Sequence, residues 1–152
     1  MAPTARDLES RTDIHDLVVA FYREVVFDEI LAPVFGEVAE VDWALHIPRL
    51  IDYWCRVLLG QPGYSGAILD AHRHVHGIEP LREEHFDRWY ALWLDAIGPR
   101  WAGPNADRAR THAAHIAGVL ARQLLDLEWQ APSLVAPGGR SADLARPSAP
   151  PR

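Results

Sequence analysis

The chain has 152 residues, a length that predicts a single domain. Its 15 basic residues, all arginine, are outnumbered by 21 acidic ones, and the first 130 residues alone carry 12 arginines and 20 acids, a net charge of −8. So acidic a body repels a phosphate backbone, which argues against nucleic-acid binding. No apolar run approaches the ~20 residues of a membrane helix, and the N-terminus lacks a signal-peptide core, so we expect a cytoplasmic protein without membrane insertion.

Composition divides the chain into three parts. Residues 1–9 are expected to form a loose N-terminal arm and residues 10–130 the folded domain. Residues 131–152 consist mainly of Pro, Ala, Ser, Gly and Arg, with too few large apolar groups to offset the entropy of ordering, so we expect a disordered tail. The single cysteine, Cys55, excludes an internal disulfide framework and a Cys-based zinc site within one chain.

Apolar residues recur with helical spacing through the whole body. The first stripe is Ile14, Leu17, Val18, Phe21, Tyr22 and Val25. Pro33 ends this helix and leaves residues 34–35 on a short connection. A second helix carries Ile47, Leu50, Ile51, Trp54 and Leu58. Because Pro48 fits best in a first helical turn, we expect this second helix to begin near His46.

Three further helical segments follow along the chain. Residues 67–76 suit about two turns, residues 86–97 form a longer helix, and Asn105 is a plausible N-cap for the last one. No stretch alternates with period two over the length of a strand. The predicted fold is therefore all-α, a compact helical bundle. Its aromatic stripes would suit either mutual packing or packing around a large flat ligand, and periodicity alone leaves both open.

Histidines form the first candidate site. His72, His74 and His76 alternate along the chain, and His72 and His76 share a face if the segment is helical. Imidazole is a good ligand for zinc, copper, iron and nickel. The chain has no H-E-x-x-H motif to complete a zinc site. Taken alone, the triplet is more typical of solvated or capping histidines than of metal ligands.

Aromatic residues with polar atoms form the second candidate. They are Tyr22, Tyr53, Trp54 and Trp89, and they lie on or beside apolar stripes, as ordinary core residues do. A buried phenol or indole nevertheless needs a hydrogen-bond partner. Several such donors near one imidazole, for example His46 on the face of Trp54, would suit a small polar ligand held on a metal.

Six segments taken together resemble the group III truncated haemoglobins. They are FYREV at 21–25, APVF at 32–35, HIPRLIDYWCRVLLG at 46–60, YSGAILDAH at 64–72, PLREEHFDRWYALW at 80–93 and WAGPNADRARTHAAHIAGVLA at 101–121. Single motifs are only moderately specific, but their order and spacing, which run from about residue 13 to residue 125, are highly specific. The resemblance implies a two-over-two helical globin that holds haem b without a covalent bond.

The resemblance also implies a role for particular residues. The histidine that closes YSGAILDAH, His72, corresponds to the proximal iron ligand; if the helical register slips by one turn, His76 takes that place. On the opposite, distal face, Tyr22, His46 and Trp89 correspond to the residues around the bound ligand.

The remaining haem contacts follow in the same way. Leu50 corresponds to the residue beside the bound gas, Trp54 to an aromatic of the pocket wall and Phe35 to the ring stacked on the porphyrin. Arg49, beside the distal turn, and Arg73, beside His72, are candidate partners for the haem propionates.

The implied function is binding of O₂, NO, CO or related small ligands at a five-coordinate ferrous iron. NO dioxygenation or peroxide chemistry would need an external reductase, and we expect a monomer or weak dimer. Two alternatives from other classes are a cofactor-free helical interaction domain, with the aromatics as plain core, and a non-haem protein in which histidines hold a metal.

Overall fold

The computed structural model describes residues 4–38, 42–64, 66 and 68–132. Most of the predicted tail, residues 133–152, lies outside this part of the chain. The elements are α1 (Arg11–Val25), the π-helical turn η1 (Val34–Val38), α2 (Trp43–Leu59), α3 (Ile68–Ile78), α4 (Glu83–Ile97) and α5 (Pro104–Leu125). The described residues form no β-strand, and the all-α prediction is confirmed. None of their helices is long and apolar enough to cross a membrane.

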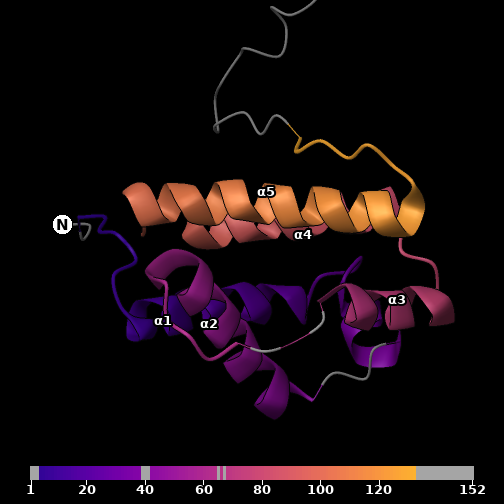
Figure 1. The fold of residues 1–152 in the computed structure, drawn as a ribbon, viewed down its shortest axis with the longest axis horizontal. Helices are drawn as coiled ribbons and strands as arrows, with labels where there is room; N and C mark the ends of the chain where they lie inside the picture. The colour runs from indigo at the N-terminus through magenta and orange to yellow at the C-terminus, as the bar shows by residue number, and fades with distance from the viewer. Residues whose placement is uncertain (1–3, 39–41, 65, 67, 133–152) are drawn as a thin grey trace, which may run out of the picture.

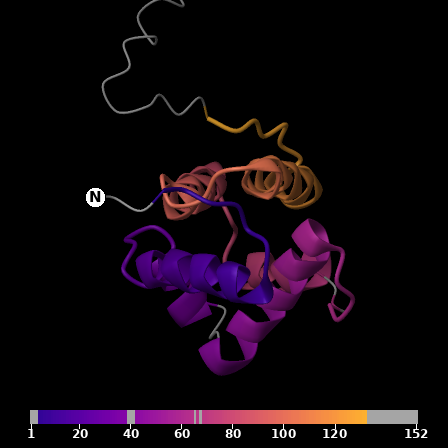
Figure 2. The same cartoon turned by 90° about the vertical axis from the view of Figure 1, so that its left-hand side faces the viewer.

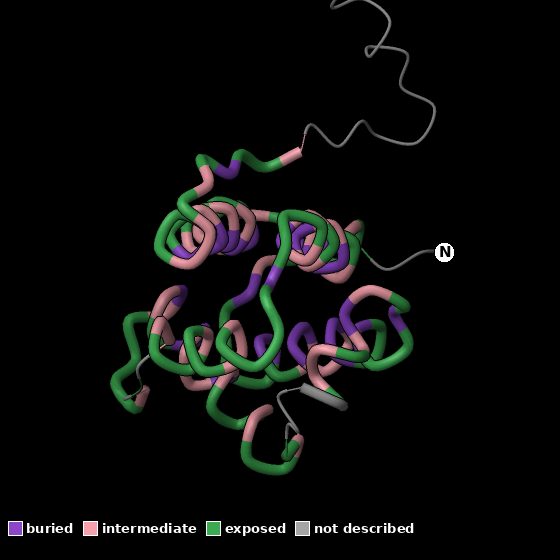
Figure 3. Tube along the Cα trace, turned by 90° about the vertical axis from the view of Figure 1, so that its right-hand side faces the viewer, coloured by how far each residue is buried: buried purple, intermediate pink, exposed green. Residues whose placement is uncertain are grey.

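The helices form two layers. The antiparallel pair α4 and α5 lies side by side in one layer, and α1, α2 and α3 make up the other (Figures 1 and 2). Figure 3 shows the buried faces of α4 and α5 turned toward the second layer. The contacts that join the layers run from α1 to α4 and from α2 and α3 to α5.

Helix α1 shows why the predicted stripe folds as a helix. Ser10 and Asp13 form a capping box, in which each side chain accepts a hydrogen bond from the other residue's N–H group. Ile14, Val18 and Val25 are completely buried, as the apolar spacing predicts. The apolar stripe predicted for α1 is therefore the face that packs into the core.

The N-terminal arm differs from the expected loose segment. Leu8 is fully buried, and the two carboxylate oxygens of Asp7 accept hydrogen bonds from the N–H groups of Asn105 at 3.0 Å and Ala106 at 2.8 Å. Asp7 thus caps α5, the role predicted for Asn105, whose side chain instead donates to the Leu8 carbonyl. The φ angle of Gly103 is 135°, and a Cβ there would lie 2.6 Å from the Asp7 carboxyl carbon, so this close approach requires glycine.

Helix α2 begins three residues before the expected start at His46. The side chain of Asp42 accepts a hydrogen bond from the Ala44 N–H at 3.0 Å and caps the helix. Pro48 consequently lies inside the helix, in its second turn, where its ring is exposed to solvent. The helix ends at Gly60, whose φ of 67° is the left-handed conformation that glycine adopts most easily.

Helix α3 is the least embedded of the helices. Its sequence is amphipathic, yet none of its residues is buried. Its apolar side chains Ile68, Leu69 and Val75 pack against the core but are only partly buried. An amphipathic helix ordinarily buries its apolar stripe against neighbouring protein. The apolar face of α3 instead borders a hollow in the molecule.

Candidate functional site

A cavity of about 470 Å³ lies between α3 and the remaining helices. This volume falls within the ~300–1,000 Å³ of ordinary ligand pockets. Its walls are mainly apolar and aromatic and come from every helix. The side chains that line it include Phe21, Tyr22, Phe35, His46, Arg49, Leu50, Tyr53, Trp54, Tyr64, Ile68, His72, His74, Val75, His85, Phe86, Trp89 and Trp93.

One wall carries an oriented imidazole. Nδ1 of His72 lies 2.8 Å from the carbonyl oxygen of Ile68, one turn earlier in α3. A carbonyl only accepts hydrogen bonds, so Nδ1 carries the proton and Nε2 keeps a free lone pair. Burial lowers the pKa of His72, although the bond to Ile68 acts in the opposite direction. His72 is therefore neutral at physiological pH, with the orientation and tautomer that metal-binding histidines require.

A second imidazole on α2 lacks a hydrogen-bond partner. Nε2 of His46 is buried, yet no protein atom in the described residues is within hydrogen-bonding reach. Its pKa is lowered mainly by burial, with smaller electrostatic effects of His72 and Arg49, which line the same cavity. A buried polar atom without a partner is costly, and such atoms commonly mark a place where a ligand binds.

Aromatic rings enclose the His46 side chain. Tyr22 approaches it edge-on at 5.6 Å between ring centroids, and Phe35 and Trp43 lie at 6.2 and 5.7 Å. Burial raises the pKa of Tyr22 far above the physiological range, so its phenol remains an O–H donor. Trp43 does not line the cavity and was not among the predicted site residues. It lies beside His46 because α2 starts earlier than expected and includes it.

Tryptophans form another part of the wall. Trp89 of α4 and Trp54 of α2 both line the cavity, as the resemblance implies, and Leu50 lies one turn before Trp54. Trp54 stacks on Trp93 at 4.5 Å, and the indole N–H of Trp93 donates to the Ala109 carbonyl at 3.1 Å. This wall is thus rigidly held between the two layers.

Polar side chains that sequence reasoning did not assign to the cavity also line it. His74 and His85 contribute to the wall, and so do Tyr53 and Tyr64, whose rings contact each other at 5.2 Å. Tyr53 stood out in the sequence as an aromatic beside an apolar stripe, but its neighbours across the fold were not predictable. Of the two candidate propionate partners, Arg49 is an exposed residue that borders the cavity. Arg73 is exposed, lies 3.9 Å from Asp70 and is not part of the cavity wall.

His76 takes a different position from His72. Its side chain is not part of the cavity wall, and its Nδ1 accepts a hydrogen bond from the Leu81 N–H at 2.9 Å. His76 therefore fastens the connection between α3 and α4. The alternative in which the register slips and His76 becomes the iron ligand does not fit this arrangement.

The described residues offer no site for a metal held by protein alone. Among residues 4–38, 42–64, 66 and 68–132, no three His, Cys, Asp or Glu side chains gather closely enough to bind an ion. A site of the usual zinc type needs at least three protein ligands. The non-haem metal alternative therefore has no support in this part of the chain.

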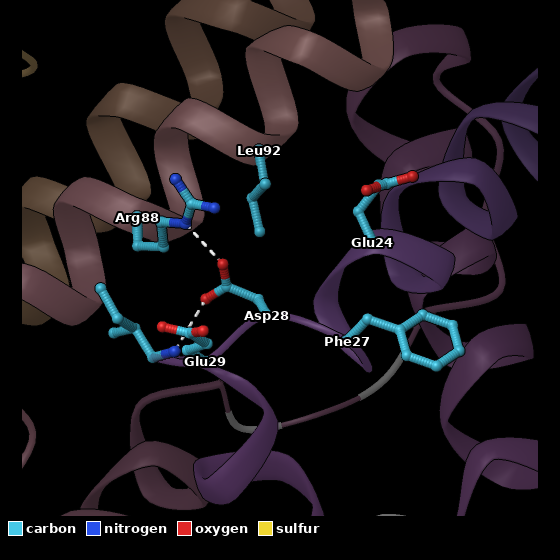
Figure 4. Close-up of a pocket in the computed structure, with 7 residues that line it drawn as sticks. Glu24, Phe27, Asp28, Glu29, Arg88 and Leu92 are labelled. Atoms are coloured by element: carbon cyan, nitrogen blue, oxygen red, sulfur yellow. Dashed lines mark hydrogen bonds and ion pairs between the residues drawn. The ribbon is translucent and has the colours of Figure 1, made fainter.

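A second depression of about 460 Å³ lies between the end of α1 and α4 (Figure 4). Its centre is an ion pair in which Nε of Arg88 donates to Asp28 at 2.5 Å, while the other Asp28 oxygen accepts from the N–H groups of Ile30 and Leu31. Burial alone would raise the pKa of Asp28, but these bonds outweigh it and hold the pKa below its usual value. Both charged groups are engaged within the protein, so this depression has a structural role.

Comparison with known proteins identifies the architecture. No family model matches the chain. A solved structure of a group III truncated haemoglobin from Campylobacter jejuni superposes with a TM-score of 0.69, at 23% identity, and covers 80% of this chain and 95% of that one. The fold is a truncated globin. A group 3 truncated haemoglobin of the same organism is 26% identical over 91 residues, which span 58% of this chain and 69% of the relative.

The truncated-globin fold accounts for the two layers and for the position of the cavity between them. The two comparisons also confirm the resemblance to group III proteins that the sequence motifs indicated. In this fold, His72 and His46 line one cavity, together with Tyr22 and Trp89. The geometry thus brings the four principal candidates to one place.

Proposed function

We propose that this chain is a globin-type haem protein that holds haem b in the aromatic cavity, with His72 as the iron ligand. The observation that carries the proposal is the pair of imidazoles on one apolar cavity, one oriented by Ile68 and the other, His46, without a partner for Nε2. A flat apolar macrocycle would cover the apolar face of α3 that the protein leaves uncovered.

The same residues suit the binding of small diatomic ligands. When bound, haem would supply a ferrous iron that takes up small ligands. Tyr22 and Trp89, which line the same cavity, would offer O–H and N–H donors to such a ligand, and neutral His46 would offer one more. Each hydrogen bond to a polar ligand in a dry cavity contributes ~1–3 kcal/mol, on the order of ten- to hundredfold in the rate of ligand escape.

Slow release of ligand suits chemistry on O₂ better than its bulk transport. We therefore include NO dioxygenation or peroxide reduction in the proposal, with electrons from an external reductase. In such reactions Tyr22 stays protonated, because its pKa is raised by burial, and holds the ligand rather than acting as a base. NO and CO compete for the same position.

A haem titration followed by absorbance tests the proposal. We expect a Soret band that saturates at one haem per chain and is lost in His72→Ala but kept in His76→Ala, the matched histidine outside the cavity. Because removal of a histidine can also unfold a protein, His72→Gly with added imidazole serves as a further check: the free imidazole should restore the band. Circular dichroism of each variant reports whether the helices are intact.

Other results lead to definite conclusions. A band that survives His72→Ala and fails in His76→Ala would show that the ligand assignment is wrong while the haem proposal stands. Absence of a specific band in the unaltered chain would refute the haem proposal. In that case the cofactor-free interaction domain becomes the better account, and Tyr22→Phe and Trp89→Phe should change stability only.

A further inference from the structure

Aromatic side chains form a continuous path along the wall of the cavity. Trp89, at the cavity wall, lies parallel to Trp93 with an interplanar angle of 2° and 6.3 Å between ring centroids. Trp93 stacks on Trp54 at 4.5 Å, and Trp54 meets the ring of Tyr53 edge-on at 5.5 Å. Indoles and phenols are the side chains that lose a single electron most readily, apart from thiols. The path therefore consists of redox-active groups in direct contact.

The path ends in a hydrogen-bonded pair. The Tyr53 hydroxyl lies 2.5 Å from Nε2 of His112, a residue of α5 that is 59 positions away in the sequence. Burial raises the pKa of Tyr53 to about 12, and burial followed by the charge of His115 lowers the pKa of His112. At neutral pH the phenol is protonated and the imidazole is neutral. In the tautomer whose Nε2 carries no hydrogen, the imidazole can accept the proton of the Tyr53 hydroxyl. The ring centroid of His115 lies 6.2 Å from that of His112, and His115 is exposed to solvent.

Core packing alone does not explain this pair. Tyr90, one residue after Trp89 on α4, shows the usual arrangement: it is buried with its ring edge-on to Trp129, and no histidine accepts its hydroxyl among the described contacts. Tyr53, in contrast, places its hydroxyl within hydrogen-bonding distance of Nε2 of His112. That nitrogen is within reach only because α2 and α5 cross at this point, in opposite layers of the fold.

We propose that Trp89, Trp93, Trp54 and Tyr53 form an electron relay along the cavity wall, from Trp89 on α4 to the partly exposed Tyr53 on α2, with His112 as the proton acceptor for Tyr53. The relay rests on the proposed haem function, because its oxidant occupies the cavity; that oxidant is a peroxide. The resemblance to truncated haemoglobins implies no role for Tyr53 or His112, and the relay gives each of them one.

The electron and proton steps balance. An electron that leaves Trp89 is replaced from Trp93, then from Trp54, and finally from Tyr53. When Tyr53 loses its electron, its O–H bond breaks and the proton passes to Nε2 of His112, which leaves a neutral tyrosyl radical beside an imidazolium. A one-electron donor at the surface then reduces Tyr53, and the proton returns. Two such electrons and two protons from solvent convert hydrogen peroxide into two molecules of water.

Freeze-quenched electron paramagnetic resonance tests the relay. Haem-loaded protein is mixed with hydrogen peroxide, and we expect a tyrosyl signal that is lost in Tyr53→Phe and unchanged in Tyr90→Phe, the matched buried tyrosine. His112→Gln separates a base from a mere hydrogen-bond acceptor, because an amide oxygen can accept the hydrogen bond but does not take up the proton at neutral pH. We expect this variant to lose the tyrosyl signal as well. A signal that persists in Tyr53→Phe or disappears in Tyr90→Phe would overturn the relay.

A second arm needs no haem. A photogenerated tris(bipyridyl)ruthenium(III) complex removes one electron from the haem-free protein, and we expect a tyrosyl radical in the unaltered chain and in Tyr90→Phe but not in Tyr53→Phe. If the titration shows no haem binding, the proposed function fails and this arm alone decides whether Tyr53 is the site that is oxidised. If haem binds and neither arm yields a Tyr53 radical, the relay is refuted and the proposed function stands.

Discussion

The molecule has a closed region and an open region. The closed region comprises residues 6–8, α1, α4 and the first half of α5, where side chains such as Ile14, Val18 and Ile97 have no solvent exposure. The open region comprises α3 and the side of α2 that faces it, and α3 has no buried residue at all. One sequence thus builds a complete core and, next to it, an apolar wall that the chain itself does not cover.

Polar groups follow the same division. In the closed region the buried carboxylate of Asp13 accepts hydrogen bonds from the N–H groups of Glu9 and Ser10 and pairs with Arg6. In the open region Nε2 of His46 is buried without a partner. Since an unsatisfied buried polar atom destabilises a fold, the contrast shows that the open region is optimised for something other than the stability of the empty chain.

Truncation of the same residue type in the two regions should give the largest difference. Ile97→Ala removes a fully buried side chain from the closed region and should cost ~2–5 kcal/mol of unfolding free energy. Ile68→Ala, at the cavity wall on α3, should cost ~1 kcal/mol or less in the haem-free protein because its side chain is only partly buried. Urea denaturation of both variants provides the measurement, and equal losses would contradict the division into two regions.

Haem binding should stabilise the open region much more than the closed region. At a free haem concentration one hundred times its dissociation constant, binding stabilises the native state by about 2.7 kcal/mol. In hydrogen exchange followed by mass spectrometry, we expect the amides of α3 to exchange rapidly in the empty protein and to slow most when haem is added. Amides of α1 are the internal control and should change much less. Equal slowing in both helices would show that α3 is already as well ordered as the core.

Removal of an aspartate should also cost different amounts of stability in the two regions, as Asp13 in the closed region and Asp70 in the open region can show. Asp13→Ala leaves buried N–H groups without an acceptor and should cost ~1–3 kcal/mol at neutral pH. Asp70, on α3, is mostly exposed and 3.9 Å from Arg73, so Asp70→Ala should cost less than ~0.5 kcal/mol. Burial alone would raise the pKa of Asp13, but the bonds from Glu9, Arg6 and Ser10 outweigh it and keep the pKa below its usual value.

The sign of the pH dependence follows from that lowered pKa. The stabilisation by Asp13 is fully present above the pKa of an unfolded aspartate and is lost as the pH falls through the lower pKa of the folded protein. The difference between the unaltered chain and Asp13→Ala should therefore shrink on acidification, as measured by urea denaturation at neutral and acidic pH. A difference that stays constant would contradict the assigned hydrogen bonds.

Local patterns were sufficient to predict most of the helices. The apolar stripe of α1 and the aromatic stripe of α4 specify their own burial, because residues three and four apart share one face of a helix. The errors concern partners that are distant in sequence. Asn105 has the right side chain for a cap, but Asp7 supplies the cap from 98 positions away. Helix α2 begins three residues before the start that Pro48 indicates, because Asp42 caps it.

The candidate site shows the same limit. The order of the motifs pointed to His72 and His46, and the structure places both on the cavity. The choice between His72 and His76 depends on the Leu81 N–H, whose position is set by the turn between α3 and α4. The contact of Tyr53 with His112 exists only where two helices cross, so no spacing within either helix could indicate it.

The cap on α5 also bears on how the protein is made. Asp7 and Leu8 emerge from the ribosome long before their partners in the fold, Asn105 and Ala106, which are synthesised almost one hundred residues later. Contacts between such distant segments close a large loop and are costly to form before the rest of the chain has collapsed. This segment is therefore among the last to find its place, and until its partners are synthesised the apolar side chain of Leu8 lacks the cover that it has in the folded protein.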